Sequence, residues 1–183
     1  MKLFIPFFLT LIILSSCFSS WESLQGESVW LVPVEQEGFS MSLPINWQEV
    51  SEFELVTPSQ WELVLAYRAS EERNGYFNNI VVLKNQNRLR ETSTSLMQNN
   101  INALKLSMQN FQVIAEDTLS FPGNTQWEVI VFEGQYGPQT PMLHYIQTAR
   151  SCDEDSYFLT ISVGSELWDY TRYYPLLESF RCN

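Results

Sequence analysis

Residues 112–133 read QVIAEDTLSF-PGN-TQWEVIVFE, two apolar runs on either side of a Pro-Gly-Asn turn. Such a turn between strand-forming runs predicts a β-hairpin. In the second run Trp127, Val129 and Val131 fall on one face, and Ile130 and Phe132 fall on the other. Because both faces are apolar, we expect this strand to lie in the centre of a sheet.

Further strands are predicted on both sides of this hairpin. Met142–Thr148 and Tyr157–Val163 form a second hairpin through the turn Ser151–Ser156. Upstream, apolar and polar residues alternate over 38–44, which is typical of a half-buried strand. Residues 61–68 and 79–84 are also strand-like, and we expect Trp61, Leu63, Leu65 and Tyr67 to share one face. Val29–Val34 reads as an edge strand, because a proline such as Pro33 is tolerated only there.

Two helices complete the pattern. Apolar residues spaced by three and four predict the first, with Thr92, Ser93 or Thr94 as its cap; these residues are Met97, Ile101, Leu104, Met108 and Phe111. The methionines at this spacing indicate core packing, not a metal or cofactor stripe. Ser165 can cap the second helix, in which Pro175 either starts the last segment or kinks it.

The order of strands, helix, four strands and helix predicts one domain of the α+β class. Turn signals between consecutive strands favour a mostly antiparallel sheet, with helices on both faces as an α/β/α sandwich.

The first seventeen residues, MKLFIPFFLTLIILSSC, determine the expected location. Leu3–Leu14 is apolar but shorter than the roughly 20 residues of a membrane-spanning helix, as in a signal peptide. The ending Leu14-Ser15-Ser16-Cys17 resembles a bacterial lipobox. The resemblance implies cleavage after residue 16 and lipidation of Cys17 by diacylglycerol, with acyl chains such as palmitate. An ordinary secretory signal or an uncleaved anchor are the alternatives.

The length and charge of the mature chain limit the partners that it can have. Cleavage leaves 167 residues (183 minus 16), which we divide into a tether over 17–35 and a domain over 36–183. The formal net charge of −11 disfavours nucleic acid and anionic lipid headgroups as partners. We therefore expect the membrane contact to be the lipid on Cys17. An aspartate after the lipidated cysteine would favour retention in the inner membrane; Phe18 stands there instead, so we expect the outer membrane if the organism is Gram-negative.

Three cysteines are present, and two remain if Cys17 is lipidated. In an exported protein the pair Cys152 and Cys182 is a disulfide candidate. Cys152 lies at a turn between two predicted strands, and the C-terminal helix should return Cys182 close to it. Two separate thiols are the alternative in a reducing environment.

The motif Gly38-Phe39…Leu43-Pro44-x-x-Trp47, the segment Asn110-Phe111-x-Val113-Ile114 and the C-terminal Pro175-Leu176-Leu177-x-Ser179-Phe180 resemble the PsbP-like family, also described as the PsbP/Mog/DcrB type. The resemblance covers about residues 36–181. It implies a non-catalytic accessory or binding module with no cofactor. The docking tail and loops of PsbP have no counterpart here, so a photosystem role is not implied.

Few side chains suggest chemistry. His144 is the one histidine and lies within a predicted strand, where a structural role is favoured over catalysis. Asp153-Glu154-Asp155 places three carboxylates in one turn, which is either solvated or a weak cation site, because calcium loops need a different ligand spacing. Phosphate-binding glycine loops, GxSxG and CxxC are absent from the sequence.

These observations lead to three functional hypotheses. The first is a lipid-anchored, non-catalytic domain of the cell envelope that binds a protein partner or assists an envelope complex. The second is a small-molecule- or cation-binding lipoprotein, for which an aromatic-lined cavity would be the sign. The third is a hydrolase, which would need a histidine, carboxylate and hydroxyl cluster around His144.

Overall fold

The computed structural model describes residues 22–24, 27–50, 61–73, 75–87, 89–121, 125–164 and 169–183. The predicted signal peptide, Cys17 and the predicted helix cap Ser165 lie outside these ranges. The elements are β1 Glu22–Leu24, β2 Glu27–Val29, β3 Leu31–Gln36, β4 Phe39–Pro44, β5 Trp47–Glu49, β6 Glu62–Ala69, β7 Asn79–Gln86, α1 Ser93–Ser107, β8 Gln109–Phe121, β9 Thr125–Gln135, β10 Leu143–Cys152, β11 Asp155–Gly164, a 3₁₀ helix Thr171–Tyr173, α2 Tyr174–Glu178 and β12 Arg181–Cys182.

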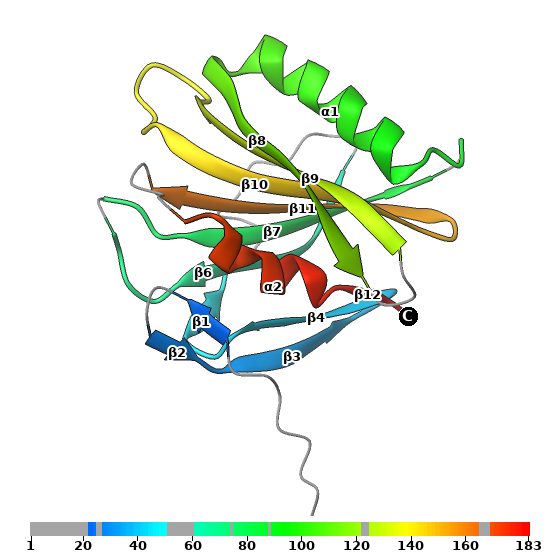
Figure 1. Cartoon of the computed structure of the whole chain (residues 1–183), viewed down its shortest axis with the longest axis horizontal. Coiled ribbons are helices and arrows are strands. Elements are labelled where there is room, and N and C mark those ends of the chain that lie inside the picture. Colours follow the sequence, from blue (N-terminus) through cyan, green and yellow to red (C-terminus); the bar gives the residue numbers. More distant parts are fainter. Residues whose placement is uncertain are drawn as a thin grey trace, which may run out of the picture.

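A seven-stranded sheet forms the centre of the molecule (Figure 1). Its order is β5-β6-β7-β11-β10-β9-β8, and each neighbouring pair is antiparallel. The two predicted hairpins are confirmed as β8–β9 and β10–β11. β9 lies between β8 and β10 with Val129, Ile130, Val131 and Phe132 all buried, as its two apolar faces predict.

Helix α1 covers one face of this sheet, over β8, β9 and β10. The Thr92 hydroxyl caps the helix by accepting a hydrogen bond from the Ser95 amide at 3.2 Å. Met97 is buried against the sheet, which confirms that the methionines belong to the core. The helix ends at Ser107, so Phe111 lies on β8 instead of the helix, yet it still stacks on Phe132 at 5.2 Å.

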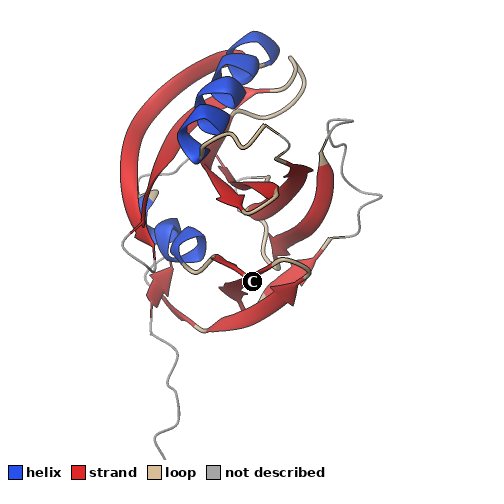
Figure 2. Ribbon diagram, turned by 90° about the vertical axis from the view of Figure 1, so that its right-hand side faces the viewer, coloured by secondary structure: helices blue, strands red, loops and turns tan. Residues whose placement is uncertain are grey.

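A second sheet, β12-β4-β3, and the short helix α2 cover the opposite face. Figure 2 shows the shorter helix between the curved large sheet and the small sheet. The predicted alternation in β4 is confirmed, because Phe39, Met41 and Leu43 are all buried. β3 is an edge strand that contains Pro33, as predicted.

The C-terminal helix is shorter than the sequence suggested. α2 spans only Tyr174–Glu178, with Pro175 in its first turn, and follows a 3₁₀ helix. Pro175 therefore starts this segment and does not kink a longer helix, in line with the preference of proline for the first helical turn. Much of the second face is covered by the small sheet, which sequence reasoning did not separate from the large one.

The predicted common face of residues 61–67 is wrong. The pairing of β6 with β7 shifts register between Leu63 and Leu65. Such a β-bulge reverses the side-chain alternation beyond it. Trp61 consequently packs in the core beneath α1, whereas Leu65 and Tyr67 pack in the core beneath α2 and the small sheet.

The pairing of β3 shows that the folded domain begins before residue 36. β3 pairs with β4 from Leu31 onward, so the folded part already includes residues at the end of the predicted 17–35 tether. In the described ranges neither helix is long and apolar enough to cross a membrane.

Candidate functional site

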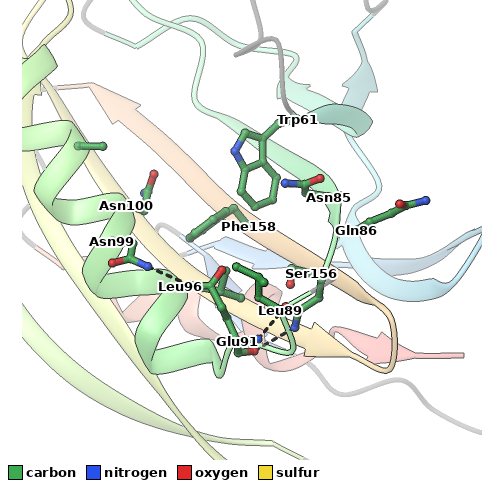
Figure 3. Close-up of a pocket in the computed structure, with 12 residues that line it drawn as sticks. Trp61, Asn85, Gln86, Leu89, Glu91, Leu96, Asn99, Asn100, Ser156 and Phe158 are labelled. Carbon is green, nitrogen blue, oxygen red and sulfur yellow. Dashed lines mark hydrogen bonds between the residues drawn. The ribbon is translucent and has the colours of Figure 1, made fainter.

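A groove of about 570 Å³ runs between α1 and the strands β7 and β11. Figure 3 shows side chains from the helix, from both strands and from the segment before α1 pointing into it. The lining residues that matter most here are Trp61, Asn85, Glu91, Asn99, Asn100 and Phe158. The volume falls within the roughly 300–1,000 Å³ typical of small-ligand sites.

Two aromatic rings form the apolar part of the groove. Phe158 on β11 is buried, and the Trp61 ring meets it edge to face with the ring centroids 4.8 Å apart. Trp61 remains partly exposed, so its indole is the ring that a ligand can reach. This arrangement arises from the β6 bulge, which leaves Trp61 on the α1 face.

Side-chain amides form the polar part. The Asn100 amide nitrogen on α1 donates to Gln147 Oε1 at 2.6 Å, and Gln147 Nε2 donates to Thr160 Oγ1 at 2.7 Å. This chain fixes Asn100 against the sheet and uses its nitrogen, which leaves its carbonyl oxygen as an acceptor. Asn85 on β7 lies across the groove from the helix (Figure 3).

The segment before α1 forms one end of the groove and is held by Asn87. Asn87 Oδ1 accepts from the Glu91 amide at 2.8 Å, and its Nδ2 donates to the Glu91 carbonyl at 2.9 Å and to Ser151 Oγ at 2.8 Å. The Glu91 carboxylate accepts from Asn99 Nδ2 at 3.0 Å. Among the described residues lining the groove, Glu91 is the one ionisable side chain.

Ser156 on β11 contributes an unsatisfied group to the same wall. It is 1% exposed, and its hydroxyl has no hydrogen-bond partner in the structure. Buried hydroxyls are usually paired, because leaving one unpaired costs about 1–3 kcal/mol. The groove therefore combines one accessible indole, amides with spare hydrogen-bonding capacity and an orphan hydroxyl, and its described lining residues include no pair of groups placed for proton transfer.

Comparison with known proteins gives matches in structure alone. No protein-family model and no curated protein matches the sequence. The solution structure of cyanobacterial PsbP (CyanoP) from Synechocystis sp. PCC 6803 matches with a TM-score of 0.60 at 13% identity, over 88% of this chain and 98% of that chain. The Ran-binding protein Mog1p of Saccharomyces cerevisiae matches with a TM-score of 0.59 at 10% identity, over 85% and 96%. A Pseudomonas aeruginosa protein of unknown function matches with a TM-score of 0.51 at 9% identity, over 81% and 91%.

The chain has a PsbP/Mog-type fold. The resemblance read from the short sequence motifs is thereby confirmed at the level of the fold. At these identities the likeness concerns the fold alone.

His144 lies on β10 and faces away from the groove. Its side chain is 12% exposed, and its Nε2 is 3.5 Å from Glu133 Oε2 on the neighbouring strand β9. Its Nδ1 is buried without a hydrogen-bond partner. A hydrolase would need a hydroxyl nucleophile at one imidazole nitrogen, and within the ranges that the structure describes no such hydroxyl contacts His144.

The acidic turn Asp153–Asp155 connects β10 and β11. Asp155 Oδ2 forms an ion pair with Lys84 Nζ at 2.9 Å, so one of the three carboxylates already has a cationic partner. This contact raises the pKa of Lys84. Asp153 and Glu154 are exposed, and no cluster of three metal-ligating side chains occurs in the described part of the chain.

Cys152 and Cys182 lie together in the structure. Their Sγ atoms are 1.96 Å apart and their Cα atoms 5.8 Å apart. Cys152 ends β10 in the large sheet, and Cys182 lies on β12 in the small sheet. A bond between them joins the two sheets. As predicted, the chain brings Cys182 back to Cys152, through a short helix followed by a strand.

Sequence reasoning did not anticipate Arg150, which is buried two residues before Cys152. Its guanidinium carbon lies 3.0 Å from the ring centroid of Trp127, 4.5 Å from that of Phe121 and 5.7 Å from that of Phe180. Burial, and secondarily the charge of Arg181, lowers the pKa of Arg150 to about 9. Its Nε and Nη1 have no hydrogen-bond partner. The only signal in the sequence is a charged residue inside an apolar strand.

The groove residues are not predictable from the sequence as a group. Asn99 falls on the polar side of the predicted helix, but nothing in the sequence places it opposite Trp61 and Asn85. Their proximity depends on which strands α1 covers, which is a property of the three-dimensional fold.

Proposed function

We propose that this protein is a non-catalytic accessory domain of the bacterial cell envelope, held on the extracytoplasmic side of a membrane by lipid on Cys17, and that it binds a protein partner. The observation that carries the non-catalytic part is the lining of the groove. Among the described residues, binding groups meet there without an acid–base pair, and His144 is packed elsewhere against Glu133.

The anchor rests on the sequence of residues 1–17. One acyl chain holds a protein only marginally on a bilayer, whereas two or more give a stable anchor. The net charge of −11 gives the domain little attraction for anionic headgroups. In this proposal the lipid therefore supplies the membrane contact, at the outer membrane if the organism is Gram-negative, and the folded domain stays available to a partner.

A protein partner is supported by the fold and by the surface. A protein of the same fold is described as Ran-binding, so this scaffold serves protein binding in at least one case. At one end of the small sheet Trp30 is 48% exposed and Ile45 63% exposed, and the Ile45 amide donates to the Trp30 carbonyl at 2.9 Å. Neighbouring exposed apolar side chains of this kind are candidate contact points for a partner.

The first experiment tests the anchor. Cells expressing the full chain are treated with globomycin, and the N-terminal peptide is analysed by mass spectrometry. We expect uncut precursor to accumulate under treatment, and untreated protein to begin at a lipidated Cys17. Processing that is insensitive to globomycin, or an unmodified Cys17 thiol, would refute the lipid anchor.

The second experiment tests the partner. The lipidated protein is crosslinked in native membranes and purified, in parallel with an Ile45→Glu variant and with Leu106→Glu as a matched control. Leu106 is 90% exposed on α1, so the control places the same charge on a different surface. We expect a specific crosslinked protein that is lost with Ile45→Glu alone. No crosslinked protein in membranes that retain the lipoprotein would contradict the proposal.

A small-molecule-binding lipoprotein is the second candidate, and the groove beside α1 favours it. The cation-binding version has less support, since Asp155 is paired with Lys84.

A further inference from the structure

We infer that the groove between α1 and β7 binds an uncharged, polyhydroxylated ligand, namely a segment of a neutral oligosaccharide. The inference rests on the proposed binding role of this groove and specifies its ligand. Four observations support it: the charge of the lining residues, the aromatic pair Trp61 and Phe158, the distribution of amide groups, and the position of β7, which forms the floor of the groove, within the sheet.

The charge of the lining excludes most other small ligands. None of the described residues that line the groove is a lysine or an arginine, and the single carboxylate, that of Glu91, already accepts hydrogen bonds from Asn99 Nδ2 at 3.0 Å and Ser95 Oγ at 3.5 Å. Phosphates and carboxylates are normally held by arginine, lysine or helix N-termini. The N-terminus of α1 lies at one end of the groove, but Thr92 caps it and the Glu91 carboxylate accepts hydrogen bonds from Ser95 and Asn99 of that helix. An anion would therefore enter next to a carboxylate, without a lysine or arginine among the described lining residues, and against the field of an acidic protein.

The aromatic pair suits the apolar face of a sugar ring. A pyranose presents C–H groups on its faces and hydroxyls around its edge. Phe158 is buried and contacts the Trp61 indole edge to face with the ring centroids 4.8 Å apart, and Trp61 remains partly exposed, so part of the indole is accessible to a ligand. The π face of an aromatic ring is electron-rich and attracts polarised C–H groups.

The amides suit the hydroxyl edge of the same ring. Each asparagine side chain has both donors and acceptors, and each sugar hydroxyl is also both a donor and an acceptor. Asn100 is fixed by its bond to Gln147 and retains its carbonyl oxygen, while Asn85 has no side-chain hydrogen bond to any described residue. Ser156 adds a buried hydroxyl without a partner in the same wall. A ligand that satisfies these groups would remove the cost of leaving them unpaired.

The floor of the groove argues against a peptide. Extended peptides usually bind by pairing with a free strand edge. β7 lies between β6 and β11 and is paired on both sides, so its backbone is not available in this way. A helical peptide needs a continuous apolar groove, whereas amides line this one on the helix side and on the strand side.

The test is titration of the full mature chain in detergent with cellohexaose, maltohexaose and chitohexaose, followed by indole fluorescence and calorimetry. An oligogalacturonate of the same length is the charged control ligand. We expect at least one neutral hexasaccharide to bind and the oligogalacturonate to bind at least tenfold more weakly.

Variants locate the binding. Trp61→Ala should weaken it at least tenfold. Since Trp61 also packs on Phe158, Ala103→Trp is the second variant, because it obstructs the groove from α1 without removing a ligand contact. Asn102→Ala is the matched control, since Asn102 lies on the same helix and lines a different hollow with β8 and β9. It should bind like the parent protein.

Three results would overturn the inference. The first is a folded protein, shown by a cooperative melting transition, that binds none of the neutral hexasaccharides. The second is binding that is unchanged in Ala103→Trp. The third is preference for the oligogalacturonate. Failure here would leave the globomycin and crosslinking tests unaffected, so it is distinguishable from failure of the proposed envelope role.

Discussion

Replacing Cys152 and Cys182 by serine should destabilise the domain by several kcal/mol. The two residues are 30 positions apart. In the chain-entropy treatment a crosslink that closes a loop of this length stabilises by about 3–4 kcal/mol, because it restricts the unfolded chain. The link also joins two sheets, since β12 has two residues and pairs only with β4. The folded state of the variant retains that pairing, so we expect the loss to come mainly from the unfolded state.

The assay is urea unfolding of the oxidised protein, the reduced protein and the double serine variant. For a urea m-value of about 2 kcal/mol/M, a loss of 3–4 kcal/mol lowers the midpoint by about 1.5–2 M. A reducing agent should shift the parent protein to the midpoint of the variant and should leave the variant unchanged. Intact mass should show the oxidised protein two hydrogens lighter than the reduced one.

The reasoning would be refuted by equal midpoints for the oxidised and reduced proteins, or by two free thiols in protein recovered from an oxidising envelope. A shift well below 1.5 M with an unchanged m-value would mean that the unfolded chain is already restricted near these residues. In the proposed lipidated form Cys17 has no free thiol, so that form is the sample in which thiol exchange involves Cys152 and Cys182 alone.

Three further predictions concern Arg150, Tyr174 and the two glycines with positive φ. Arg150→Met removes a guanidinium that no described carboxylate pairs with. Urea unfolding should therefore show a free energy of unfolding within about 1 kcal/mol of that of the parent, or higher. A loss of about 3–5 kcal/mol would indicate that Arg150 belongs to a buried ion pair. Tyr174→Phe removes a hydroxyl that donates to the Asp117 carboxylate on β8, and it should lower the free energy of unfolding by about 1.5 kcal/mol. Burial raises the pKa of Tyr174 above its usual 10.0, so this contribution is complete below pH 10 and is lost as the pH rises further, and the parent should lose more stability than the variant in alkaline urea titrations. Gly38→Ala should cost about 1–3 kcal/mol, because φ is +87° and a Cβ would lie 2.6 Å from the Tyr157 hydroxyl, while Gly75→Ala, with φ +78° and open space, should cost less in the same thermal melts.

The regular part of the fold could be predicted from the sequence because one-sided burial produces a visible period. Phe39, Met41 and Leu43 alternate with serines, and all three are buried beneath the large sheet. The helix spacing of Met97 and Ile101 is equally direct. In both cases the information is local, since a few neighbouring residues determine which face is apolar.

Features that depend on pairing between distant segments were not predictable. The β6 bulge changes the direction of Leu65 relative to Trp61, and nothing in the local pattern indicates where the pairing with β7 shifts. Arg150 is tolerated in the core because Trp127 and Phe180 surround it, and these residues come from different elements. The shortness of α2 likewise reflects the return of the chain to β4, which local helix signals do not encode.

The candidate groove arises from the ratio of sheet width to helix width. Neighbouring strands are about 4.8 Å apart, so seven strands span about 29 Å, whereas one helix with its side chains is about 10–12 Å across. A single α1 therefore covers only part of the face, and the neighbouring part over β7 and β11 stays accessible. The α1 face of these two strands carries three partly exposed polar residues, Asn79, Asn85 and Thr160, which suit contact with water or a polar ligand, and two buried serines, Ser156 and Ser162.

Solvation alone does not account for every residue on this face. Water satisfies Asn85 and Thr160 readily, because both are partly exposed. Ser156 is 1% exposed, and the partly exposed Trp61, which lines the same groove, gains little from water. An apolar ring and an unsatisfied hydroxyl in one groove are the combination that a ligand with both kinds of surface would complete. Ser156→Ala offers a direct comparison: it should raise the stability of the free protein while weakening oligosaccharide binding, and an increase in stability with unchanged binding would assign the hydroxyl no role in the groove.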